Sequence, residues 1–138
     1  YRARQILEVG AAGLAAEHAT GEDLATMADE VASMFATIDQ PAVFLIHDVA
    51  FLRAIANASA NQVVASLVDM VAALHYETRD QAPPAGREEL QDPAEMHRRI
   101  YRAIRARDVG AARQLMHDHL KRPWWEHRQL EPEASVTE

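Results

Sequence analysis

Apolar residues recur at intervals of three and four along most of the chain, the spacing that places them on one face of a helix. The alternation of apolar and polar positions that marks a half-buried strand is not sustained anywhere. Alanine is abundant and β-branched runs are short, which favours helices further. The pattern therefore predicts an all-α fold of about six helices without a strand.

The first four helices have clear boundaries in the sequence. Periodicity predicts helices at residues 2–18, 21–38, 42–58 and 62–80. Thr20, followed three residues later by Asp23, forms a capping-box pattern before the second helix. Pro41 marks the break before the third helix, and Asn61 is a favourable N-cap for the fourth.

The last two helices follow a linker-like stretch at residues 81–90, QAPPAGREEL, where two prolines and a glycine oppose a continuous helix. Asp92, Pro93 and Glu95 then combine a capping carboxylate, a proline at the first helical position and an acid at the third. The fifth helix is predicted to begin there. Asp108 is predicted to cap the sixth.

Helical periodicity also predicts which residues turn inward. On the first helix these are Ile6, Val9, Gly13 and Leu14. On the second they are Leu24, Met27, Val31 and Met34, and on the fourth Val64, Leu67, Val71 and Leu74.

Composition limits the kind of protein. The 138 residues, 49% of them apolar, fit one globular domain, which we assign to residues 1–122, followed by a weakly docked tail at 123–138. Fourteen Lys and Arg against 21 Asp and Glu give a net charge of −7, so this chain is not expected to bind nucleic acid itself. The chain has no cysteine, which excludes disulfides and thiolate ligands.

The expected location is the cytoplasm. No strongly apolar run approaches the ~20 residues that span a bilayer, and no signal peptide is visible. The chain opens without an initiating Met, as if at a cut, so we expect that a domain precedes it.

Two of the seven histidines are placed symmetrically about the predicted turn at Asp108. His97 lies eleven residues before Asp108 and His119 eleven residues after it. At ~1.5 Å per residue, each lies roughly 16 Å from the turn, so an antiparallel hairpin brings them to the same height. Each also shares a face with apolar residues of its own helix. Both rings are predicted to face the core, either as hydrogen-bonded core residues or as metal ligands.

Asp48 is predicted on the same side of the third helix as Leu52 and Ile55. A buried carboxylate without a partner is strongly unfavourable, so an inward aspartate indicates a nearby cation. The alternative is a position at the rim, where Asp48 pairs with an arginine such as Arg4 or Arg53.

Three segments carry a resemblance to a known family. Residues 48–61, DVAFLRAIANASAN, resemble the Asp-x-x-Phe-His-x-x-Ile-x-x-Ala-x-x-Asn signature of the FCD domain, the C-terminal effector-binding domain of FadR-type GntR transcription regulators. Residues 95–120, EMHRRIYRAIRARDVGAARQLMHDHL, are similar to the His-x-x-Ile to His-Leu ending of that family. Residues 4–20 resemble its opening helix, with Arg4 and Glu8 in its Arg-x-x-x-Glu. The resemblance covers roughly residues 1–120.

The resemblance implies an antiparallel helical bundle around a central ligand cavity, which usually holds a divalent metal that helps to bind a small carboxylate effector. The family's metal aspartate falls on Asp48, and its two later histidines fall on His97 and His119. Its histidine one turn after the aspartate falls on Leu52, which has no ligand atom. The set is therefore reduced to three ligands, and the metal is expected to bind more weakly.

Asp with two His is still a competent set for Zn, Ni, Mn or Fe, with open positions for water or an effector carboxylate. His75 is the better substitute for the lost ligand, because His47 points about 100° away from Asp48 around the helix. His117 and His127 are predicted to face solvent.

The predicted effector-binding residues are Arg4, Leu52, His75 and Tyr101. Arg4 either faces the cavity and binds the carboxylate of the effector or forms a surface salt bridge with Glu8. Tyr101 either lines the pocket or only packs.

The predicted function is effector sensing in a transcription regulator. DNA would be bound only through an N-terminal winged-helix domain that this chain lacks, and the domain is expected to form a homodimer. One alternative is a metal-dependent enzyme with an Asp/His/His centre. The other is a dimerization bundle that has lost its metal.

Overall fold

The computed structural model describes residues 2–121, and these form six α-helices. The helices are α1 (Arg2–His18), α2 (Gly21–Ala36), α3 (Pro41–Ala58), α4 (Gln62–Asp80), α5 (Arg87–Arg105) and α6 (Val109–Lys121). No strand occurs between residues 2 and 121. The all-α prediction is confirmed, while the predicted tail at 123–138 lies outside the described residues.

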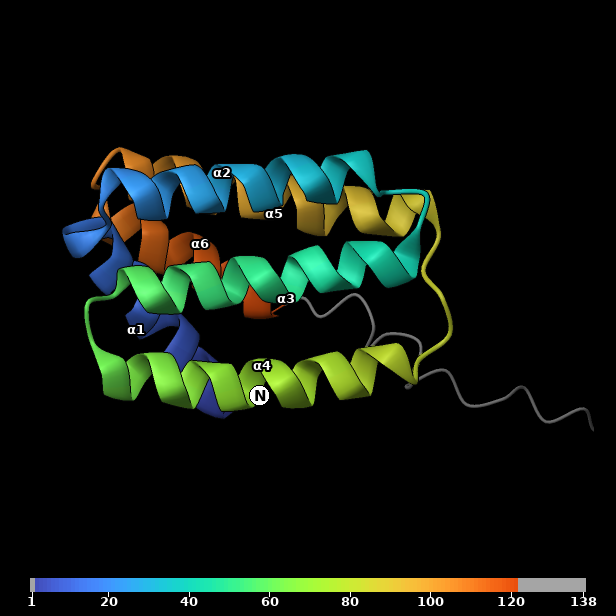
Figure 1. The fold of residues 1–138 in the computed structure, drawn as a ribbon, viewed down its shortest axis with the longest axis horizontal. Helices are drawn as coiled ribbons and strands as arrows, with labels where there is room; N and C mark the ends of the chain where they lie inside the picture. The colour runs from blue at the N-terminus through green and yellow to red at the C-terminus, as the bar shows by residue number, and fades with distance from the viewer. Residues whose placement is uncertain (1, 122–138) are drawn as a thin grey trace, which may run out of the picture.

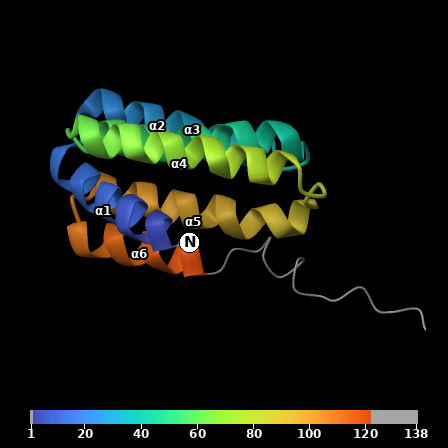
Figure 2. The same ribbon diagram turned by 90° about the horizontal axis from the view of Figure 1, so that it is seen from below.

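The helices pack in two layers of three (Figures 1 and 2). One layer contains α2, α3 and α4, with α3 packed between the other two, and the second contains α5, α6 and α1. Within the first layer successive helices run antiparallel, and so do α5 and α6 (Figure 1). Helix α3 also packs against α1 in the other layer, so it lies at the centre of the bundle.

Local capping sets several of the helix starts. Thr20 Oγ1 accepts from the Asp23 amide at 3.1 Å while Asp23 Oδ2 accepts from the Thr20 amide at 2.9 Å, which completes the predicted capping box. Asn61 Oδ1 accepts from the amides of residues 63 and 64, both at 3.1 Å. Asp108 Oδ1 accepts from the Ala111 amide at 3.0 Å. All three predicted caps are confirmed.

The predicted start of the fifth helix is wrong. Helix α5 begins at Arg87 after the N-cap Gly86, and Pro93 lies inside it rather than at its first position. Leu90, on the added N-terminal part, is 1% exposed, and Pro93 and Ala94 are buried as well. Burial of these apolar groups offsets the backbone hydrogen bond that Pro93 cannot donate.

The predicted inner face of the fourth helix is wrong in part: Val64 packs against the core as predicted, but Leu67 and Leu74 do not. Val68, Ala72 and His75 are its buried residues, whereas Leu67 and Leu74 are 38% and 59% exposed. The buried face is thus turned by one residue, about 100°, from the predicted one. Helix α4 lies at the edge of its layer and packs against α3 and α1, so much of its apolar surface is left uncovered.

Helix α1 buries mainly small residues, although Val9 packs against the core as predicted. Its buried apolar residues are Ala11, Ala12, Ala15 and Ala16. Ile6 is 74% exposed, which corrects its predicted inward position. Gly13 is buried as predicted, and a Cβ there would lie 2.9 Å from the side chain of Arg113 on α6. These small residues let α6 approach α1 closely.

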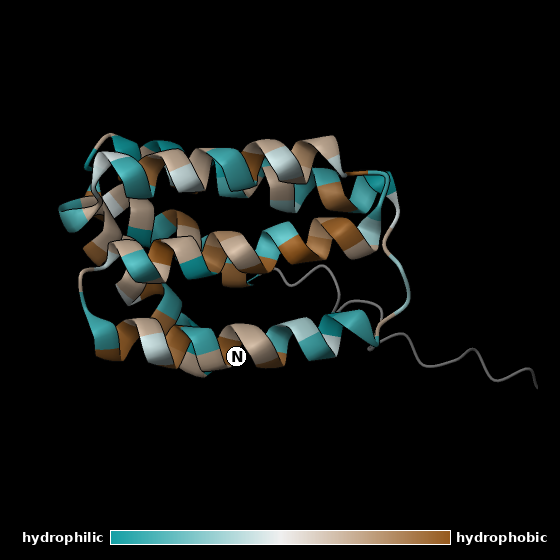
Figure 3. Ribbon diagram, viewed as in Figure 1, coloured by the Kyte–Doolittle hydropathy of each residue, from teal (hydrophilic) through white to brown (hydrophobic). Residues whose placement is uncertain are grey.

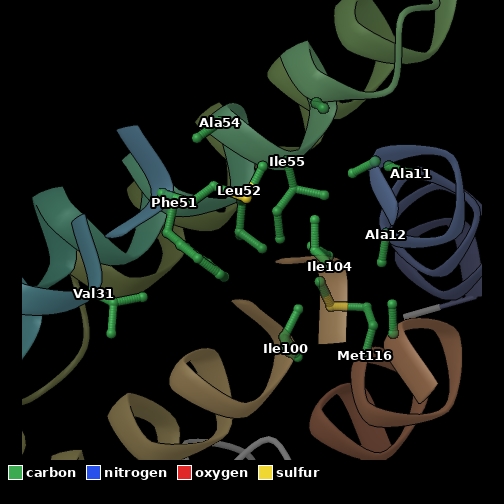
Figure 4. Packing of buried hydrophobic residues seen from close by; sticks show 14 of the residues in the cluster. Ala11, Ala12, Val31, Phe51, Leu52, Ala54, Ile55, Ile100, Ile104 and Met116 are labelled. Carbon is green, nitrogen blue, oxygen red and sulfur yellow. The ribbon is translucent and has the colours of Figure 1, made fainter. Parts of the chain in front are cut away.

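The core is formed by apolar residues that recur along the helices with polar residues between them (Figure 3). Around α3, Figure 4 shows Leu52 and Ile55 packed among Ile100, Ile104 and Met116. Helix α3, with 18 residues and a mean hydropathy of 1.3, has the length and composition to cross a membrane. Its apolar character is explained here by its position between helices, because nine of its residues are buried.

Candidate metal and effector site

His97 and His119 face each other in the core, as their symmetry about Asp108 predicts. Their Nε2 atoms are 3.1 Å apart and their ring centroids 4.6 Å, with the rings edge to face. His97 is completely buried. The chain reverses between α5 and α6 at Arg107, whose φ of 60° lies in the left-handed region.

Asp48 joins the two histidines from α3. Its Oδ1 is 3.4 Å from His97 Nε2, and the side chain is 16% exposed. Its Oδ2 is 3.5 Å from His75 Nε2 on α4. The alternative pairing with Arg53 is wrong, because Arg53 pairs with Asp69 at 2.6 Å instead. Four helices therefore bring the three predicted metal residues together with His75.

Arg4 and Glu8 extend the cluster onto α1. Arg4 donates from Nε to Glu8 Oε2 at 2.8 Å and from Nη2 to Oε1 at 3.3 Å. Arg4 Nη1 also lies 3.4 Å from His75 Nδ1. Because Glu8 is only 2% exposed, the pair is a buried one and not the surface salt bridge considered from the sequence. Both ideas about Arg4 are thus partly right: it pairs with Glu8 and it faces the cluster.

Burial and mutual proximity set the charge of these groups. Burial raises the pKa of Asp48, but a hydrogen bond from His75 and attraction by His97, His75 and His119 outweigh it and hold that pKa well below its usual range. Burial lowers the pKa of His97 despite the opposing effect of Asp48. Burial, with His97 beside it, lowers the pKa of His119 to about 3. At neutral pH the site therefore combines an ionised carboxylate with two neutral imidazoles.

Both ring nitrogens of His97 have a contact in the core. Its Nδ1 lies 3.3 Å from the sulfur of Met34, and the Phe51 ring packs against it with centroids 4.8 Å apart. A proton on Nδ1 would point at the sulfur, a weak acceptor. With the proton on Nδ1, Nε2 would be free to bind a metal, whereas a proton on Nε2 would face Asp48 Oδ1 at 3.4 Å.

Contacts between neighbouring donors have the length expected of ligands on one metal ion. Atoms bound ~2.0–2.1 Å from a tetrahedral zinc lie roughly 3.3–3.4 Å apart, and His97 Nε2 lies 3.1 Å from His119 Nε2 and 3.4 Å from Asp48 Oδ1. Among residues 2–121, however, no group of three or more His, Asp or Glu side chains is arranged so that it could hold a metal ion. The residue types suit a metal, but the side chains would have to move before they enclosed one.

Leu52 and Tyr101 pack against apolar side chains of the core. Leu52, one turn after Asp48, is 2% exposed and packs in the apolar core. Tyr101 is half-buried against the core, with the Arg105 guanidinium 5.5 Å from its ring centroid. His47 contacts Glu30 at 2.7 Å, away from the cluster.

The solvent-facing histidines were predicted only in part. His117 is half-buried rather than fully exposed. His127 lies outside the described residues.

A pocket of about 80 Å³ adjoins the cluster. It lies between the start of α3, the end of α4 and the connection to α5, and Asp48 and Arg79 line it together with Phe44, Leu45 and Leu90. Sequence reasoning missed Arg79, because nothing in the α4 pattern distinguishes it from a surface arginine. The buried carboxylate of Asp48 thus borders a space large enough for a small ligand.

The fold and the site define an all-helical bundle with a polar Asp–His cluster in its core. The FCD domain family matches residues 1–122, so the chain belongs to the FCD domain family. This confirms the resemblance found in the sequence motifs. The chain is also similar to the HTH-type transcriptional regulator LutR of Bacillus subtilis (strain 168), with 32% identity over 121 residues. That alignment covers 85% of this chain and 55% of LutR, so the chain spans about half the length of this relative.

Proposed function

We propose that this chain is the effector-binding domain of a GntR/FadR-type transcription regulator and that it binds a small carboxylate through a divalent metal. The observation that carries the proposal is the convergence of Asp48, His97 and His119 in the core of an FCD domain. The relationship to a transcriptional regulator supports sensing rather than enzymatic turnover.

The metal would be held by one carboxylate oxygen of Asp48 and by Nε2 of His97 and His119. Mixed nitrogen and oxygen donors of this kind suit Zn, Ni, Mn or Fe. Neutral imidazoles are available as ligands without losing a proton, which favours binding at neutral pH. Leu52 supplies no donor, so water or effector oxygens would complete the coordination shell.

The effector would lie beside the metal. A pocket of about 80 Å³ next to Asp48 limits it to a small molecule, and the guanidinium of Arg79 lines the same pocket. Arg4 approaches from the other side through His75. Guanidinium groups bind carboxylates with paired N–H donors, so a small organic acid is the class of ligand that this site favours.

Ligand binding would act on the helices that supply the site. The cluster joins α3, α4, α5 and α6, so an effector that binds one packing of these helices more tightly would shift the equilibrium toward it. In the whole protein, we propose, this change reaches a separate DNA-binding domain in the cytoplasm.

A homodimer would carry the change between two copies. Val63, Leu67, Met70 and Leu74 form an apolar stripe along α4 and are between 38% and 69% exposed. Their spacing of three and four residues puts them on one helix face. We propose that this stripe packs against a second copy.

The test is a thermal-shift screen of small mono-, di- and hydroxycarboxylates, with and without Zn²⁺. At a hundredfold excess over its Kd, a true effector adds about 2.7 kcal/mol to the free energy of unfolding. The triple variant Asp48→Asn, His97→Ala, His119→Ala should lose both the metal and the carboxylate response. If the variant and the wild type respond equally to every acid, the proposed site is wrong.

A further inference from the structure

His75 contacts the carboxylate oxygen of Asp48 that lies on the α4 side. His75 Nε2 is 3.5 Å from Oδ2, whereas His97 Nε2 is 3.4 Å from Oδ1. The two histidines therefore contact different oxygens of the Asp48 carboxylate. Oδ1 lies on the side of the His97–His119 pair, where the metal would bind, and Oδ2 is directed toward α4.

Arg4 determines which nitrogen of His75 carries the proton. Arg4 Nη1 lies 3.4 Å from His75 Nδ1, and a guanidinium has N–H donors but no acceptor. Nδ1 therefore accepts, and a neutral imidazole that accepts at Nδ1 carries its proton on Nε2. That N–H is directed at Asp48 Oδ2.

Glu8 keeps Arg4 in this place. Its two carboxylate oxygens accept from Arg4 at 2.8 and 3.3 Å, and the glutamate is almost fully buried. A forked pair of this kind fixes the plane of the guanidinium. The contacts then run without a break from Glu8 on α1 through Arg4 and His75 to Asp48 on α3.

We propose that His75 is a positioning residue, which donates from Nε2 to Asp48 Oδ2 and thereby turns Oδ1 toward the metal. It does not replace the ligand that is missing at Leu52. As a ligand, His75 would need a bare Nε2 and a proton on Nδ1, which would then face the N–H of Arg4. This inference rests on the proposed metal-binding function and limits the protein ligands to Asp48, His97 and His119.

The first test is ¹⁵N NMR of the histidine rings in the metal-free protein. We expect Nε2 of His75 to carry a proton and Nδ1 to accept from Arg4. The double variant Arg4→Met, Glu8→Leu removes both buried charges together and should weaken that preference. A wild-type spectrum with the proton on Nδ1 of His75 overturns the inference, and this readout does not depend on metal binding.

The second test is Zn²⁺ titration calorimetry on His75→Ala and His75→Gln. Glutamine keeps an N–H donor near the position of Nε2 but is a poor metal ligand. Loss of a hydrogen-bonding partner of a ligand typically weakens metal binding about ten- to a hundredfold, which we expect for alanine, whereas glutamine should stay close to wild type.

The outcomes separate the two proposals. If glutamine is as damaging as alanine while circular dichroism shows both variants folded, His75 is a ligand and the inference is wrong. If wild type binds no Zn²⁺, the proposed metal function fails, and the NMR result alone decides the role of His75. His47→Gln makes the same change at a histidine that contacts Glu30 instead and should leave Zn²⁺ binding unchanged.

Discussion

His97 and His119 face each other at 3.1 Å between Nε2 atoms, although 22 residues separate them in the chain. At this distance a proton or a metal ion must lie between or beside the two nitrogens, because two facing lone pairs repel. The lowered pKa of His119 disfavours protonation, and Asp48 Oδ1 lies 3.4 Å from His97 on the same side. Because both imidazoles are neutral, the N–H of one ring is donated to the bare nitrogen of the other in the metal-free protein.

We expect His97→Ala and His119→Ala each to abolish measurable Zn²⁺ binding, because two remaining protein ligands rarely hold a metal against water. Titration calorimetry checks this. His18→Ala, at an exposed position beside Glu17, is the matched control and should bind as wild type does. Unchanged affinity in His97→Ala would show that these residues do not share a metal.

Leu52→His should strengthen metal binding. The new imidazole would lie one turn after Asp48 and add a fourth ligand, and an affinity gain of about tenfold corresponds to 1.4 kcal/mol. Leu52→Met, which conserves volume without adding a nitrogen, is the control. Both variants are compared with wild type by calorimetry after their helix content has been checked. Equal affinities in all three proteins would contradict the assignment of Leu52 to the position of the missing fourth ligand.

Acid should destabilise the metal-free protein before its carboxylates are protonated. The pKa of His119 is about 3 when folded and ~6.5 when unfolded, so below that upper value the unfolded chain takes up the proton first. Stability is therefore lost as pH falls from ~6.5 toward 3, at up to about 1.4 kcal/mol per pH unit for each such histidine. The low pKa of Asp48 adds a further loss below ~3.9.

Urea unfolding at several pH values measures this dependence. His119→Leu should give a shallower dependence between pH 6.5 and 4 than wild type. Identical slopes would mean that His119 takes up its proton equally well in the folded protein.

Charges on the outer face of α4 should separate the proposed dimer. Leu67→Glu with Leu74→Glu places two carboxylates on the apolar stripe, and burying them against a second copy would be strongly unfavourable. Sedimentation equilibrium is expected to give a dimer for wild type and a monomer for the double variant. Gln91→Glu, at an exposed site on α5, should remain dimeric. A wild-type monomer would refute the stripe as an interface.

The helices and their caps were largely predictable from sequence, because both depend on neighbouring residues. The capping box of Thr20 and Asp23 and the cap at Asn61 involve contacts within three residues, so the local sequence contains both partners. It was also predictable that His97 and His119 would lie at the same distance from the turn. Each is eleven residues from Asp108, and two antiparallel helices rise equally over equal numbers of residues.

Predictions from neighbouring residues were wrong where the packing of the core favoured a different arrangement. Asp92 and Pro93 form a favourable helix start, but burial of Leu90 extends α5 back to Arg87. On α4 the predicted and the observed buried faces differ by a rotation of about 100° around the helix, which corresponds to one residue. Only the positions of α3 and α1 decide which face is buried, and the sequence of α4 does not contain them.

The chain from Glu8 to Asp48 depended entirely on tertiary structure. The sequence placed Arg4 and Glu8 one turn apart and determined that they could pair, but not that the pair would be buried. Likewise it determined that Asp48 and His75 belong to neighbouring helices, but not which oxygen and which ring nitrogen would meet. Burial and contact of charged groups depend on how helices cross, and that is set by the packing of the whole core, including small residues on α1 such as Ala12 and Gly13 that have no ligand atoms themselves.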